Sequence, residues 1–161
     1  MNLPDAESLT QSYATNHWLI KNITEGLTNA DSLVQPPYAG NCLNWVLGHI
    51  LAGRHTALKL AGAAPVWNQD EGDRYKTGSP PITSSEQALP LEKLLGDLDR
   101  SQESIAAALG NKSKAELMVE AETNRGVKPV AQHLAGLHWH ETYHTGQLEL
   151  LRDLAKASQG E

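Results

Sequence analysis

Two histidines one helical turn apart are the residues of this chain best suited to metal chemistry. They belong to the run His140-Glu-Thr-Tyr-His-Thr-Gly-Gln147, inside a stretch from Val127 to Lys156 that is predicted to form one long helix. At 100° per residue, His140 and His144 share a stripe with the apolar residues of this helix, about 6 Å apart along its axis. Two imidazoles at that separation can bind one ion such as Zn, Ni, Cu or Fe. The spacing predicts half of a metal site, which needs at least one further ligand.

His49 is a better candidate for that further ligand than His55 or His133. It lies at the edge of the apolar arc of a second predicted helix, from Cys42 to about Ala61. His55 shares its face with polar residues, so we expect it to be solvated. His133 lies on the inward face of the last helix, but about 10 Å along the axis from His140, too far to share one ion comfortably. We expect His133 to be a buried, hydrogen-bonded histidine that lines the cavity.

Several of these residues also have a purely structural interpretation. A histidine on an apolar face is more often a hydrogen-bonded core residue than a ligand. Glu141 can orient a neighbouring ligand, act as a general base, or pair with another helix. Cys42, at a helix N-terminus, can have a lowered pKa, although a small buried cysteine is the simpler interpretation. Three carboxylates are expected to mark a solvated helix face: Asp97, Asp99 and Glu103.

The segment from His140 to His144 also satisfies the H-E-x-x-H pattern of zinc peptidases, in which Glu141 would be the general base. Few residues follow His144, and the carboxylates among them lie on the same helix or at the last position. We find no upstream strand that could hold an extended peptide. The peptidase interpretation is therefore disfavoured.

Four stretches with apolar residues at helical spacing are expected to form the scaffold. They run from Asp5 to about Leu27, from Cys42 to about Ala61, from Pro90 to about Leu109, and from Val127 to Lys156. Strand signals are weak, because no segment alternates convincingly between apolar and polar residues. The pattern therefore predicts an all-α four-helix bundle, with residues 1–161 forming a single domain.

The connections between these helices predict how they run. Asp5 and Asn41 are expected to cap the first and second helices, and Gly62 is expected to end the second. The long loop 62–86 can carry the chain back across the bundle, so the second and third helices are expected to run parallel. We also expect a short helical piece at 115–119.

The bulk composition excludes several classes of protein. The formal charge of −6 at pH 7 argues against a nucleic-acid partner. No run of about 18 apolar residues is present, so no membrane span is expected. The first residues lack the basic and apolar regions of a signal peptide, and a single cysteine excludes an internal disulfide framework. We expect a cytoplasmic protein.

Two motifs resemble those of the DinB/YfiT-like proteins. They are Asn44-Trp45-x-x-Gly48-His49 on the second helix and His140-x-x-Tyr143-His144-x-Gly146-Gln147 on the last. The resemblance extends to helix order and the long crossover, and so covers nearly the whole chain. It implies an up-down-down-up bundle with a long crossover between the second and third helices. It also implies a divalent metal held by His49, His140 and His144, with Zn or Ni favoured and Fe or Mn as alternatives. It also implies an open coordination position and, often, a homodimer.

The activities known in that family include S-transferases that use low-molecular-weight thiols such as bacillithiol or mycothiol, a mycothiol-dependent isomerase, and suspected hydrolases. The resemblance therefore implies a metal-dependent enzyme in which the ion lowers the pKa of a thiol or of water. Glu141 is the candidate catalytic residue. A hydrolase using the same site and a non-catalytic bundle whose ion only joins two helices are the alternatives. The loop 62–86 is expected to form the variable wall of the pocket.

Overall fold

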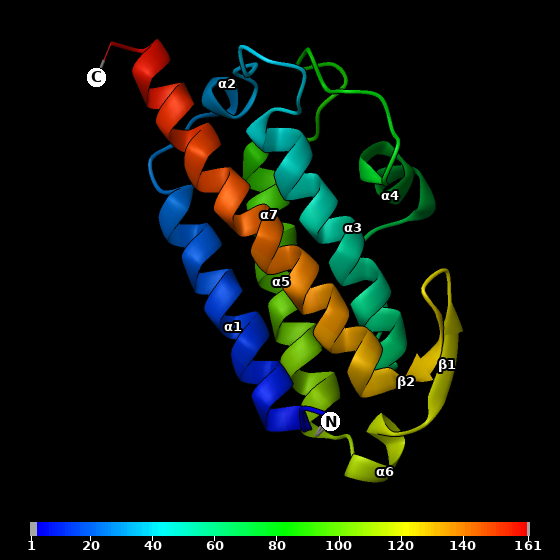
Figure 1. Ribbon diagram of the computed structural model, residues 1–161. Helices are drawn as coiled ribbons and strands as arrows, with labels where there is room; N and C mark the ends of the chain where they lie inside the picture. Colours follow the sequence, from blue (N-terminus) through cyan, green and yellow to red (C-terminus); the bar gives the residue numbers. More distant parts are fainter. Residues whose placement is uncertain (1–2, 161) are drawn as a thin grey trace.

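The computed structural model describes residues 3–160, and its framework is a set of four long helices packed side by side (Figure 1). They are α1 (Ala6–Ile23), α3 (Leu43–Ala61), α5 (Leu91–Gly110) and α7 (Val130–Ser158). Helices α1 and α3 each contact both α5 and α7. Figure 1 shows α1 and α7 running in one direction and α3 and α5 in the other. Within the described residues, no helix is both long and apolar enough to cross a membrane.

The ends of the first two long helices test the capping residues expected from the sequence. Asp5 caps α1, since its Oδ1 accepts a hydrogen bond from the Ser8 N–H at 2.9 Å. Gly62 ends α3 in the left-handed region, with φ of 83°. The expected cap at Asn41 is wrong, because α3 begins after Cys42, which makes no side-chain capping bond.

Cys42 is fully buried, and its thiol donates to the Ile82 carbonyl at 3.4 Å. Burial raises the pKa of this thiol. Because the thiolate is the reactive form, Cys42 is the small structural cysteine rather than a nucleophile.

The connections contain further short elements. They are α2 (Asn29–Ser32), α4 (Gln69–Tyr75), α6 (Lys114–Leu117), and an antiparallel hairpin of β1 (Glu120–Thr123) and β2 (Gly126–Pro129). Helix α6 overlaps the short helical piece expected at 115–119. The hairpin corrects two expectations: residues 127–129 belong to a strand rather than to the last helix, and the fold is not purely helical. Four-residue strands that are largely polar are too short to show alternation.

The expectation that three carboxylates of α5 are solvated is wrong for one of them. Asp97, expected on a solvated face, is fully buried and accepts from the Trp67 indole N–H at 2.5 Å. Lys93 and Arg100 also bond to its carboxylate. Asp99 remains half-exposed, with partners His17 and Lys21. Asp97 is buried because Trp67, from the segment before α4, covers it while two cations neutralise its charge.

Candidate metal centre

Three histidines converge between α3 and α7. His49 comes from α3, whereas His140 and His144 come from successive turns of α7. One ligand-capable atom from each residue lies within 4.8 Å of the other two. The Nε2 atoms of His140 and His144 are 3.1 Å apart, and the ring of His49 is centred 5.1 Å and 4.8 Å from their rings. The structure therefore brings together the three histidines that the sequence singles out.

Hydrogen bonds set the tautomers of two of these rings. The Nδ1 of His49 lies 2.7 Å from the Tyr75 carbonyl oxygen, and the Nδ1 of His144 lies 2.6 Å from the Gln147 side-chain oxygen. Because both partners are acceptors, each Nδ1 carries the proton, and each Nε2 keeps its lone pair. Histidines that donate through one nitrogen and bind metal through the other are the usual arrangement in metalloproteins.

Burial lowers the pKa values of two of the three histidines. It lowers the pKa of His140 to about 4, with smaller contributions from His144, His49 and Arg125. Burial also lowers the pKa of His144, against the opposing hydrogen bond to Gln147. Neutral imidazole is the form that binds metal, and two nitrogens on one tetrahedral Zn lie about 3.4 Å apart. The spacing, tautomers and charge of these rings fit a divalent transition-metal ion.

The motif on α3 builds the surroundings of His49. The ring of Tyr75 packs directly on Gly48, where a Cβ atom would overlap it. The Tyr75 hydroxyl donates to the Asn44 side-chain oxygen at 2.9 Å, which fixes the tyrosine on the helix. Trp45 stacks on the His49 ring, with centroids 4.8 Å apart and planes 15° apart. Every specified residue of this motif thus positions either His49 or the carbonyl that it binds.

The motif on α7 is explained in part. Gln147 holds the ring of His144, and Tyr143 contacts that ring edge to face with centroids 5.2 Å apart. Tyr143 is exposed rather than packed in the core. An added Cβ at Gly146 would meet nothing within 4 Å, so nothing in the structure explains a glycine there.

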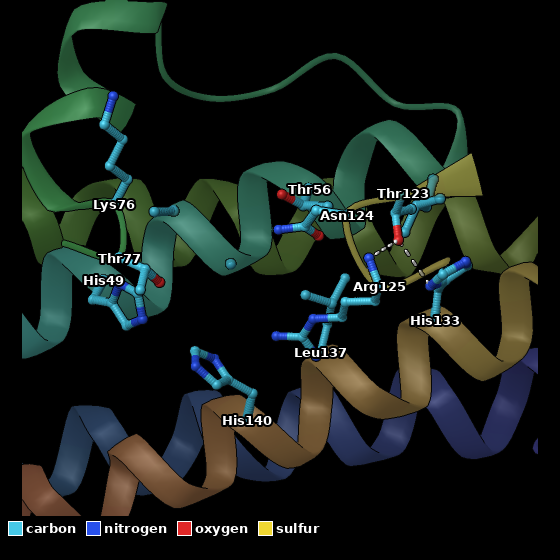
Figure 2. Close-up of a pocket in the computed structure, with 13 residues that line it drawn as sticks. His49, Thr56, Lys76, Thr77, Thr123, Asn124, Arg125, His133, Leu137 and His140 are labelled. Atoms are coloured by element: carbon cyan, nitrogen blue, oxygen red, sulfur yellow. Dashed lines mark hydrogen bonds between the residues drawn. The ribbon is translucent and has the colours of Figure 1, made fainter. Parts of the chain in front are cut away.

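The histidine cluster lies between two cavities. The first, of about 330 Å³, is shown in Figure 2 and is lined largely by polar and cationic residues, among them His49, Thr56, Lys76, Thr77, Asn124, Arg125, His133 and His140. The second, of about 500 Å³, shares His49 and His140 with the first and also reaches His144. It adds an aromatic and aliphatic wall of Tyr38, Trp45, Tyr143, Leu150 and Leu151. Two openings of different chemistry therefore meet at the cluster, and small molecules can approach it from both.

Of the other histidines considered from the sequence, His133 lies as expected and His55 does not. His133 is buried, bonds to the Ala121 carbonyl at 2.9 Å and lines the first cavity, as expected. His55 is half-buried rather than solvated, and its buried Nδ1 has no hydrogen-bond partner within residues 3–160. Burial lowers the pKa of His55, which lines neither cavity.

The walls of the cavities come partly from elements that the sequence did not indicate. Loop 62–86 contributes Lys76 and Thr77, which agrees with its expected role as a wall. The tip of the β1–β2 hairpin contributes Thr123, Asn124 and Arg125, which sequence reasoning missed. The run Asn-Arg-Gly at 124–126 was an available signal, because three-residue hairpin loops commonly end on a glycine in the left-handed region, as Gly126 does with φ of 88°.

Glu141, the candidate catalytic residue, lines neither cavity. Both of its carboxylate oxygens accept hydrogen bonds from Arg54, from Nε at 2.9 Å and from Nη2 at 2.7 Å. Arg54 is 0% exposed and Glu141 is 3% exposed. Arg54 also donates to the Ser101 hydroxyl at 3.1 Å and to the Tyr13 carbonyl at 3.3 Å. A role for Glu141 as a base stays a prediction, and its engagement with Arg54 does not support it.

The chain is similar to known proteins in sequence pattern and in fold. The model of the DinB superfamily matches residues 10–148. A conserved protein from Enterococcus faecalis has a similar structure, with a TM-score of 0.73, 15% identity, and coverage of 97% of this chain and 99% of that one. No curated protein matches the chain in sequence.

The mycothiol-dependent maleylpyruvate isomerase also has a similar structure, with a TM-score of 0.68 and 12% identity. The alignment covers 92% of this chain and 63% of the isomerase chain. A histidine-to-alanine mutant of that isomerase aligns over the same shares, with a TM-score of 0.65 and 13% identity. At these identities the likeness concerns the fold alone.

Proposed function

Because the chain belongs to the DinB superfamily, we propose that its up-down-down-up bundle holds a divalent metal ion on His49, His140 and His144. Zn or Ni suits three imidazoles best, with Fe and Mn as alternatives. We further propose a metal-dependent enzyme that activates a small thiol for S-transfer. The observation that carries the proposal is the convergence of three histidines at the junction of two cavities. A bound ion of this kind lowers the pKa of a thiol or of water toward neutrality.

The protein's own residues prepare this centre. The Tyr75 carbonyl and the Gln147 amide hold the protons on the Nδ1 atoms, which leaves the Nε2 lone pairs for the ion. The stacked Trp45 ring restricts rotation of His49. Groups that orient ligands in this way typically change metal affinity by about 10- to 100-fold when removed.

The two cavities favour S-transfer over hydrolysis. In S-transfer the thiol sulfur forms a bond to an electrophilic carbon, the leaving group departs with the electrons of the broken bond, and the thiol proton passes to solvent. Two organic reactants must therefore meet at one centre, and the cluster borders two separate openings. Hydrolysis needs one organic substrate and water. The similarity to a mycothiol-dependent isomerase supports a small thiol as the co-substrate.

Two alternatives stay open to the same tests. A hydrolase would use the same three histidines. A structural ion would only join α3 and α7, but structural zinc sites are usually closed by four protein ligands. The single domain, the homodimer and the cytoplasmic location stay predictions from the sequence.

Metal analysis tests the ligand assignment. His144→Ala should abolish stoichiometric uptake of Zn²⁺ or Ni²⁺, because one of three ligands is lost. His55→Ala should leave uptake intact, because this histidine of α3 lines neither cavity. Equal retention of metal in both variants contradicts the assignment.

A screen of thiols against electrophiles on the metal-loaded protein tests the reaction. Equal consumption of thiol and electrophile supports S-transfer. Product that forms equally well when no thiol is added identifies the hydrolase instead.

A further inference from the structure

The hairpin tip carries an arginine into the first cavity. Gly126, with φ of 88°, turns the chain at the start of β2, and the Arg125 N–H donates to the Thr123 hydroxyl at 3.0 Å. Figure 2 shows Arg125 reaching from the hairpin past Leu137 into the space beside His140. A short, closed turn therefore presents a cationic side chain toward the histidine cluster.

This arginine has little to bind within the protein. Its guanidinium makes one hydrogen bond, from Nη1 to the Gly136 carbonyl at 3.3 Å. Within residues 3–160 no carboxylate lies within ion-pair distance of it. A guanidinium offers five N–H donors in a planar fork that matches a carboxylate. Most of its bonding capacity is therefore available to a ligand.

The rest of the cavity wall has the charge expected for an anion site. The described residues that line it include no Asp or Glu, although the chain as a whole carries a charge of −6. Lys76 is the other cation, but its Nζ is paired with Asp73 at 3.0 Å, and in Figure 2 it points away from the histidines. The hydroxyl of Thr56 and the amide of Asn124 supply neutral hydrogen-bonding groups.

We infer that the first cavity binds a small organic acid, with its carboxylate on Arg125 and its other end at the histidine cluster. The inference rests on the proposed function only in treating that cluster as the reacting centre. A carboxylate has two oxygens for this one guanidinium to pair, whereas a phosphate has four oxygens that need further donors. The second cavity, with its aromatic wall, is left for the other reactant.

Calorimetric titration of the metal-free protein with succinate tests this inference. Metal is removed because a carboxylate can also bind an ion directly. Succinate should bind, and its neutral analogue succinamide should not. Arg125→Gln should weaken succinate binding roughly tenfold to hundredfold, the loss typical of a charge-assisted hydrogen bond. Arg125 is exposed, so this variant should fold.

Lys128→Gln is the matched control, because it removes the same charge from the same hairpin but lies outside the cavity. It should bind succinate as the unaltered protein does. The inference is overturned if succinate fails to bind at millimolar concentration, if Arg125→Gln binds it undiminished, or if inorganic phosphate binds more tightly.

Metal uptake by the same proteins, measured on separate samples, separates the two proposals. Arg125→Gln that takes up metal but loses succinate supports both. An unaltered protein that takes up no metal contradicts the proposed function, while the succinate titration still decides the inference.

Discussion

Helices α3 and α7 hold two polar clusters that are close in sequence and different in character. His140 and Glu141 are consecutive on α7, and His49 and Arg54 lie on α3 little more than one turn apart. The histidines border two cavities. The Arg54–Glu141 pair is buried, and Arg54 also donates hydrogen bonds to Ser101 and Tyr13. Successive helical residues point about 100° apart. One pair of helices can therefore hold a histidine cluster open to cavities on one face and a buried ion pair on another.

The two clusters also differ in how they tolerate burial. Burial lowers the pKa of His140 to about 4 and also lowers the pKa of His144, which favours the neutral form of both rings. Arg54 and Glu141 are buried as a bidentate ion pair with added hydrogen bonds to Ser101 and Tyr13. Losing one partner of such a pair leaves a buried charge uncompensated. Loss of a histidine leaves no charge behind, so the two clusters should respond differently to mutation.

The largest expected effect comes from Glu141→Gln. It leaves the Arg54 charge unpaired and should lower the free energy of unfolding by about 3–5 kcal/mol, measured by urea denaturation. Metal stoichiometry, measured below the unfolding transition, should be unchanged. Glu149→Gln on the same helix is the control: its side chain is 59% exposed, it lies 3.5 Å from Arg152, and it should cost under about 1 kcal/mol. A Glu141→Gln protein that keeps its stability but binds no metal would contradict this assignment of stability to the ion pair and of metal binding to the histidines.

A smaller loss of stability is expected from a substitution at Gly48, where α3 packs against the ring of Tyr75. In Gly48→Ala the new methyl group overlaps the Tyr75 ring, which should cost about 1–3 kcal/mol of stability. It should also weaken metal binding, because the carbonyl that holds His49 must move. Gly53→Ala on the same helix meets nothing within 4 Å and should be neutral or stabilising. Thermal unfolding and metal titration of both variants distinguish them, and equal behaviour would show that the close approach at Gly48 has no function.

The smallest effect on stability is expected from Gln147→Leu, which should instead weaken metal binding. Gln147→Leu removes the acceptor of the His144 Nδ1–H bond. Metal affinity should fall about 10- to 100-fold, while the free energy of unfolding should change little, because Gln147 lies at the cavity rather than in the core. Gln132→Leu, at an exposed position of α7, should change neither quantity. Competition with a chelating dye measures the affinity, and an undiminished value for Gln147→Leu would rule out its orienting role.

Sequence periodicity predicted the helices and the three converging histidines because both depend on which residues share a helix face. His49, His140 and His144 lie on or beside apolar stripes, so packing α3 against α7 is enough to bring them together. The same reasoning located His133. The family motifs added the pairing of the histidines across two helices.

Other features depend on contacts that one helix pattern cannot reveal. Sequence reasoning missed the partner of Glu141, although Arg54 shares a face of α3 with the buried residues Ile50, Leu51, Ala57 and Leu58. The orienting carbonyl of Tyr75 belongs to the backbone and has no side-chain signature. The hairpin carrying Arg125 has strands of four residues, too short for a periodic signal.

X-ray absorption spectroscopy of the Zn- or Ni-loaded protein tests the three-histidine centre most directly. The expected spectrum contains three imidazole ligands and at least one further light atom, and addition of a small thiol should introduce a sulfur ligand. His144→Ala should lose the signal together with the metal. An ion saturated by four protein side chains, with no response to thiol, would contradict an open catalytic centre at His49, His140 and His144.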